Sequence, residues 1–117
     1  MLYLANTFSL ALLPAGRSKL DVKDVPLALV KTLLASGPWE SIVGIGDLAM
    51  LYGKLLDMNI MQGCADALFT DNDIIIIGLY QGPQTPKGID PTPDAANVRW
   101  LMISVDEHSV SAVDEQT

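Results

Sequence analysis

The chain has little of the chemistry that most catalytic and metal sites use. Its 117 residues contain one cysteine, Cys64, and one histidine, His108. A single cysteine excludes an internal disulfide, so a cytoplasmic setting is the simplest interpretation. No group of cysteines and histidines has the spacing of a metal site, and we expect neither a metal nor a cofactor. His108 lies in a polar segment near the C-terminus, where nothing would orient it as a catalytic base.

Basic residues are also scarce. The chain has seven lysines and arginines against fourteen acidic residues, which gives a net charge of −7. The basic residues are scattered, so no stripe of them follows a polynucleotide backbone, and an acidic surface repels one. This argues against duplex nucleic acid as a partner, but not against a small anion held by backbone amides. The longest aliphatic run, Ile74–Ile77, is far shorter than the roughly 20 residues of a membrane span, so we expect no membrane partner.

Hydrophobic residues, in contrast, make up half of the chain, enough for one buried core. Short apolar segments and amphipathic segments follow one another, which predicts a single domain of the α/β class. We expect this domain to span residues 1–105 and a flexible acidic tail to follow over 106–117.

The individual elements follow from periodicity and from capping residues. Asp24 is a favourable N-cap for a helix over residues 25–36, with Pro26 in its first turn. Asp47 is the expected cap of a second helix, whose apolar stripe has the helical period. Ile74–Ile77 does not alternate with polar residues, which predicts a central strand covered on both faces. The segment 81–97 is a long, proline-rich connection of the kind that forms binding loops. Strands are expected at 1–5, 20–22, 39–43, 65–70, 73–80 and 98–105.

Two turns that follow apolar strands carry binding chemistry. In Gly44–Asp47, two glycines let backbone N–H groups approach an anion at the positive end of a helix dipole. The other turn offers the Asn6 amide and the hydroxyls of Thr7 and Ser9. Both turns could lie at one edge of the same sheet, where α/β folds place ligands. A structural tight turn and helix capping are the alternative interpretations.

Three segments together resemble a known family. ANTFSLALLP, WESIVGIGDLAMLYGKLL and DIIIIGLYQGPQTPKG occur in an order and spacing similar to the small viral anti-CRISPR ring nucleases of type III systems. The resemblance covers roughly residues 1–105. It implies a small mixed β-sheet flanked by helices and a homodimer. It also implies that the two-fold axis of the dimer passes through a pocket for cyclic tetra-adenylate, an immune second messenger that the family destroys.

The chain departs from this family at the catalytic positions. The family's histidine falls on Ile45, its acidic residue on Lys87, and its arginine near Gln84. A further basic position falls near Cys64. An isoleucine cannot protonate a leaving 5′-oxygen, and a lysine reverses the charge of the acid. Since acid–base groups contribute about 10²- to 10⁴-fold to a rate, we assign no catalytic residue.

The resemblance therefore predicts that the chain binds and sequesters a cyclic oligoadenylate-like messenger, as a viral sponge or a sensor. Its expected location is the cytoplasm, that of the host cell if the protein is viral. The expected ligand-binding residues are Asn6, Thr7, Phe8, Ser9, Gly44, Ile45, Gly46, Asp47, Gln81, Gln84 and Lys87.

Two alternatives stay open. The chain could be an active ring nuclease with relocated groups, for which Tyr80, Lys87 and Asp47 are the candidates. It could instead be a protein-binding module on the same fold, with the late loop and Ile45 as its partner surface.

Overall fold

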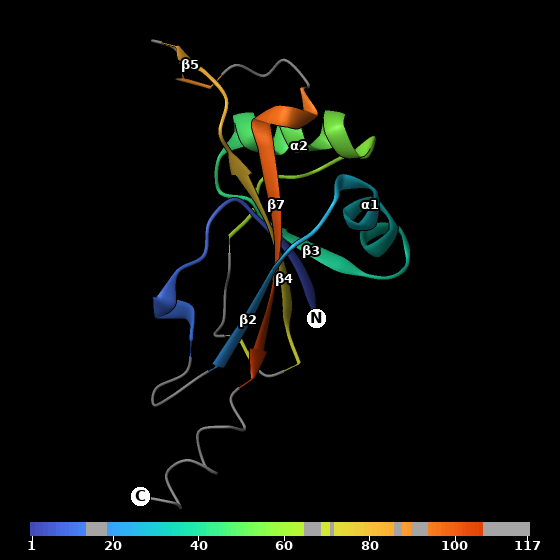
Figure 1. Ribbon diagram of the computed structural model, residues 1–117, viewed down its shortest axis with the longest axis vertical. Helices are drawn as coiled ribbons and strands as arrows, with labels where there is room; N and C mark the ends of the chain where they lie inside the picture. The colour runs from blue at the N-terminus through green and yellow to red at the C-terminus, as the bar shows by residue number, and fades with distance from the viewer. Residues whose placement is uncertain (14–18, 65–68, 71, 86–87, 90–93, 107–117) are drawn as a thin grey trace, which may run out of the picture.

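A mixed β-sheet forms the centre of the fold (Figure 1). The computed structural model describes residues 1–13, 19–64, 69–70, 72–85, 88–89 and 94–106. Within these ranges the main sheet has the strand order β2–β7–β4–β1–β3. Strand β1 runs parallel to β3 and β4, and β7 runs antiparallel to β2 and β4. The elements are β1 (Leu2–Ala5), η1 (Leu10–Leu12), β2 (Lys19–Asp24), α1 (Leu27–Ala35), β3 (Trp39–Ile42), α2 (Gly46–Leu56), β4 (Ile74–Tyr80), β5 (Gln84–Thr85), β6 (Gly88–Ile89), η2 (Ala95–Asn97) and β7 (Val98–Asp106). The predicted α/β class and mixed sheet are confirmed.

Apolar side chains fill both faces of this sheet. On one face, residues of α1 and α2 form a core cluster with Ile76 and Trp100 of the strands. On the other face, Ile75 and Ile77 pack against Phe69. The three isoleucines are at most 2% exposed and alternate between the faces. Strand β4 is therefore covered on both sides, as its unbroken aliphatic run predicts.

Tyr52 joins α2 to the central strand β4. Its side chain is fully buried, and its hydroxyl donates a hydrogen bond to the carbonyl oxygen of Gly78. A Cβ atom at position 78 would lie only 2.7 Å from the Tyr52 Cζ atom. The close approach of the ring to the strand therefore requires a glycine. The Trp100 ring packs beside it, with 5.1 Å between the ring centroids.

The start of α1 differs from the prediction. Pro26 precedes the helix with an extended backbone (φ −75°, ψ 156°) and makes no side-chain cap. Asp24, the predicted cap, instead ends β2 and pairs with Leu101 of β7. Its carboxylate accepts hydrogen bonds from Arg99 at 2.7 and 3.0 Å, and these bonds lower the pKa of the Asp24 carboxyl. Pairing with β7 therefore extends β2 to a residue that we expected to cap the helix.

The described part of the connection between β4 and β7 contains short regular elements. It contains the hairpin β5–β6, and the short helix η2 is capped by Asp94, whose side chain accepts from the Ala96 N–H at 3.0 Å. Residues 65–68 of the predicted strand 65–70, and the segment 107–117, lie outside the described ranges. The division at residue 105 stays a prediction. Among the described residues, no helix is long and apolar enough to cross a membrane.

The buried hydroxyl of Tyr52 should make the free energy of unfolding depend on pH. Burial raises the pKa of its hydroxyl above the usual value of about 10. Above pH 10 the unfolded chain loses this proton and the folded chain keeps it, so stability falls with rising pH. Tyr52→Phe should cost about 1 kcal/mol near pH 7, through the lost hydrogen bond. That cost should shrink between pH 10 and pH 11, as measured by urea unfolding. A constant difference in the free energy of unfolding between the wild type and Tyr52→Phe from pH 9 to pH 11 would contradict this pH dependence.

Candidate functional site

The two predicted turns meet at one edge of the sheet. Strands β1 and β3 are parallel neighbours, with Ala5 opposite Ile42, so the chain leaves both strands at the same edge. The N–H of Gly44 then donates a hydrogen bond of 2.9 Å to the Asn6 side-chain oxygen. Residues 38 positions apart in the chain thus form one structure, as the sequence pattern predicted.

A cavity of about 260 Å³ lies where the turns meet. Of the predicted ligand-binding residues, Asn6, Thr7, Ser9, Gly44 and Ile45 line it. Its other lining residues are Leu12, Ile42, Gly63 and Cys64. The cavity thus combines amide, hydroxyl and backbone groups with an apolar wall, a composition that suits the bases and sugars of a nucleotide.

The first turn of α2 begins beside this cavity without a side-chain cap. Its N-cap residue is Ile45, which has an extended backbone, makes no capping hydrogen bond and is half exposed. The predicted cap at Asp47 is therefore wrong, because Asp47 lies inside the first helical turn. An apolar N-cap costs about 1 kcal/mol relative to serine or asparagine. It leaves the first N–H groups of the helix for another acceptor, and the helix dipole favours an anionic one.

Of the other predicted ligand-binding residues, Gly46 and Asp47 begin α2 and do not line the cavity. Phe8 stacks on Phe69 in the core, with 5.8 Å between ring centroids. Gln81 has an exposed side chain, and its N–H donates to the Asn97 carbonyl. Gln84 is exposed on β5. Lys87 and His108 lie outside the described residues.

The hairpin β5–β6 approaches the start of α2 (Figure 1). A Cβ atom built on Gly88 would lie 3.6 Å from the Asp47 carboxylate. Gly88 has a φ of +116°, a backbone conformation that favours glycine. Gly88, in the segment predicted to form a binding loop, is therefore close to Asp47 at the start of α2.

Sequence reasoning missed the segment that contributes Gly63 and Cys64 to the cavity lining. The segment 61–64 runs along the outer edge of β3, where the Gly63 N–H donates to the Val43 carbonyl at 3.0 Å. The Ser41 hydroxyl donates to the Met61 carbonyl. A Cβ atom at Gly63 would lie 2.2 Å from the Ser41 carbonyl oxygen, so only glycine fits. The one available signal was the family position that falls near Cys64.

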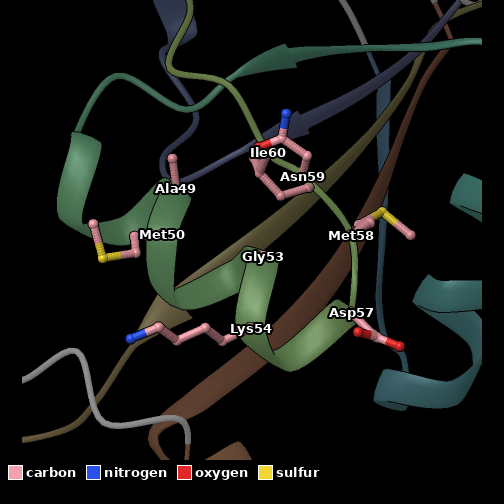
Figure 2. A pocket seen from close by; sticks show the side chains of 8 residues that line it. All are labelled: Ala49, Met50, Gly53, Lys54, Asp57, Met58, Asn59 and Ile60. Atoms are coloured by element: carbon pink, nitrogen blue, oxygen red, sulfur yellow. The ribbon is translucent and has the colours of Figure 1, made fainter.

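A second hollow, of about 430 Å³, lies over the C-terminal half of α2 and the loop after it (Figure 2). It is larger than the first but contains none of the predicted ligand-binding residues. Figure 2 shows the side chains of Lys54 and Asp57 pointing apart, so their charges do not converge on one ligand group. Its shape follows from Gly53, where a Cβ atom would lie 2.8 Å from the Met58 carbonyl oxygen. We therefore place the candidate site at the first cavity.

The first cavity offers hydrogen-bonding and apolar groups. Its lining residues include no carboxylate, imidazole or amine. Tyr80, a candidate for a relocated active site, donates its hydroxyl to the Pro83 carbonyl at 2.5 Å. Within the described ranges, no three metal-ligating side chains gather. The lining residues can donate and accept hydrogen bonds, and Cys64 adds a thiol.

The fold and the cavity define a small α/β domain with a ligand-sized site at the carboxyl ends of its parallel strands. No family model matches the chain, and no curated protein does. Among solved structures, the chain is similar to B116 of Sulfolobus turreted icosahedral virus, with a TM-score of 0.69 and 12% sequence identity. The match covers 88% of this chain and 97% of B116. A viral protein of similar size therefore has the same fold.

Two glycines that line the cavity should respond differently to one added methyl group. Gly63→Ala should destabilise the protein by about 1–3 kcal/mol, since its Cβ atom would meet the Ser41 carbonyl. Gly44→Ala is the matched control, because the nearest atom to its Cβ lies 4.0 Å away. Its stability should stay within about 0.5 kcal/mol of the parent. Equal changes in the free energy of unfolding for the two substitutions, measured by chemical denaturation, would contradict the close contact between Gly63 and the Ser41 carbonyl.

Proposed function

We propose that the chain binds and sequesters a cyclic oligonucleotide second messenger of the cyclic oligoadenylate type, and that it leaves the ring intact. In this role it would act as a viral sponge or as a sensor. The observation that carries the proposal is the contact between Asn6 and Gly44 beside the uncapped first turn of α2. The two turns that the family resemblance assigns to the messenger pocket thereby form one cavity.

The groups in this cavity suit a phosphodiester ring. Backbone N–H groups at the start of a helix bind phosphate oxygens without a cation. The Asn6 side chain uses its oxygen for Gly44, so its NH₂ group is the one turned to a ligand acceptor. Ile42, Ile45 and Leu12 supply apolar surface for a base or a ribose. Lys87, at the family's acidic position, would add a cation in the late loop.

Loss of turnover follows from Ile45. It stands at the family's histidine position and has no group that can donate a proton. An inhibitor that sequesters its target acts by stoichiometry, so slow release takes the place of cleavage. The active ring nuclease remains the alternative, with Asp47 and Tyr80 as its described candidates. Neither of these two side chains lines the cavity.

A homodimer fits this function, because a two-fold symmetric ring is contacted most evenly by two identical surfaces. The apolar residues Ile45, Met50 and Met61 are at least half exposed on α2 and the segments beside it. A second copy of the chain would cover such surface. The same exposure favours the protein-binding module as the second candidate, with an unrelated protein in place of the second copy.

Binding and turnover of cyclic tetra-adenylate separate these candidates. Calorimetry should give one ring per two chains, and chromatography should recover the ring intact after hours with the protein. Linear tetra-adenylate, the matched control ligand, should bind more weakly because it must lose more conformational freedom. Multiple-turnover opening of the ring would support the ring nuclease instead. If neither this nor a related ring binds, the protein-binding module becomes the better interpretation.

Asn6→Asp tests which group faces the ligand. The carboxylate keeps an acceptor for the Gly44 N–H, so the free energy of unfolding should change by less than about 1 kcal/mol. It replaces the NH₂ donor by a negative charge, and affinity for the ring should fall at least about tenfold. Asn59→Asp adds the same charge at an exposed position outside the cavity and should bind normally. Normal binding by Asn6→Asp would remove Asn6 from the site.

A further inference from the structure

Both backbone polar groups of Gly44 are held by side chains. Its N–H donates to Asn6, and its carbonyl oxygen accepts a hydrogen bond of 2.9 Å from the Gln62 Nε2 atom. Asn6 comes from the turn after β1, whereas Gln62 comes from the segment that follows α2. Two parts of the chain far apart in sequence therefore fix the two peptide groups that flank the Cα atom of Gly44.

Gln62 also contacts the next glycine of the turn. A Cβ atom at Gly46 would lie 3.2 Å from the Gln62 Oε1 atom, tighter than most contacts of real Cβ atoms. The Gln62 side chain therefore spans the turn from Gly44 to the first residue of α2. The backbone on either side of Gln62 is held too. The Met61 carbonyl accepts a hydrogen bond from the Ser41 hydroxyl of β3, and the Gly63 N–H donates to the carbonyl of Val43, the residue after β3.

Such a support matters because the turn is intrinsically soft. Two glycines in three residues give the unliganded backbone many accessible conformations. If the peptide group between Gly44 and Ile45 rotated, the Gly44 carbonyl oxygen could point at the ligand and repel its phosphate. Holding this carbonyl in place lowers the entropy that binding must remove.

We propose that Gln62 is a positioning residue for ligand binding: its amide fixes the Gly44–Gly46 turn in the conformation that presents the first N–H groups of α2 to an anion. This inference rests on the proposed function, and it adds a residue that neither the sequence pattern nor the resemblance points to. Gln62 acts through the turn and does not line the cavity.

Two substitutions at this position test the role. Gln62→Met keeps the length of the side chain and removes the donor, and it should weaken the binding of cyclic tetra-adenylate about three- to tenfold. Gln62→Glu also places a negative charge beside the Gly44 carbonyl, so its loss at pH 7.5 should be larger. At pH 5, a protonated carboxyl can donate to Gly44 again, and part of the lost affinity should return. Asn59→Asp, with the same added charge in the same segment, should show neither effect.

Amide NMR spectra of the ligand-free proteins provide a readout that does not depend on the ring. The Gly44 and Gly46 signals should shift or broaden in both Gln62 variants, while signals from β4 and β7 stay unchanged. Unchanged Gly44 and Gly46 signals, or wild-type affinity of Gln62→Met, would overturn the assignment. A wild-type protein that binds no ring would instead overturn the proposed function, and the NMR comparison would still decide whether Gln62 holds the turn.

Discussion

The contact between Tyr52 and Gly78 fixes the geometry on which the site depends. A fully buried phenol ring lies against a strand residue without a side chain, and its hydroxyl bonds the backbone of that strand. This contact holds α2 at one distance from the sheet. Only three residues, 43–45, separate β3 from α2, so a helix held in this way also determines where the Gly44–Gly46 turn lies. The position of the candidate cavity thus depends on how one ring packs in the core.

The candidate site relies on backbone groups more than on charged side chains. Its centre is Gly44, whose N–H and carbonyl oxygen are each bonded by a side-chain amide, next to a helix that begins without a side-chain cap. Such a site needs no cluster of basic residues, so anion binding at this site is compatible with a net charge of −7. It also restricts the chemistry. Backbone N–H groups stabilise a bound phosphate, but they cannot carry a proton between two oxygens of a ring.

Much of this architecture could be read from local patterns. The stripe in α2 and the unbroken isoleucines of β4 report burial directly, because side-chain period and solvent exposure are linked. Asn6 and Gly44 were found because both follow apolar strands. The errors have a common cause in contacts between distant segments. Asp24 has the residue type of a helix cap, but pairing with β7 makes it a strand residue. Ile45 is a poor cap by type, and no local rule would place it there. Gln62 and Gly63 belong to the site only because their segment returns to β3.

The outer edge of the main sheet at β2 has a consequence for the behaviour of the protein at high concentration. A strand paired on one side only is a template for aggregation with other chains. Here the edge strand has exposed Lys19, Asp21 and Lys23, and the last two form an ion pair at 3.4 Å. Charged side chains along such an edge oppose sheet-to-sheet association. A protein that works by sequestration must accumulate to the level of its target, so solubility would limit its capacity as directly as affinity does.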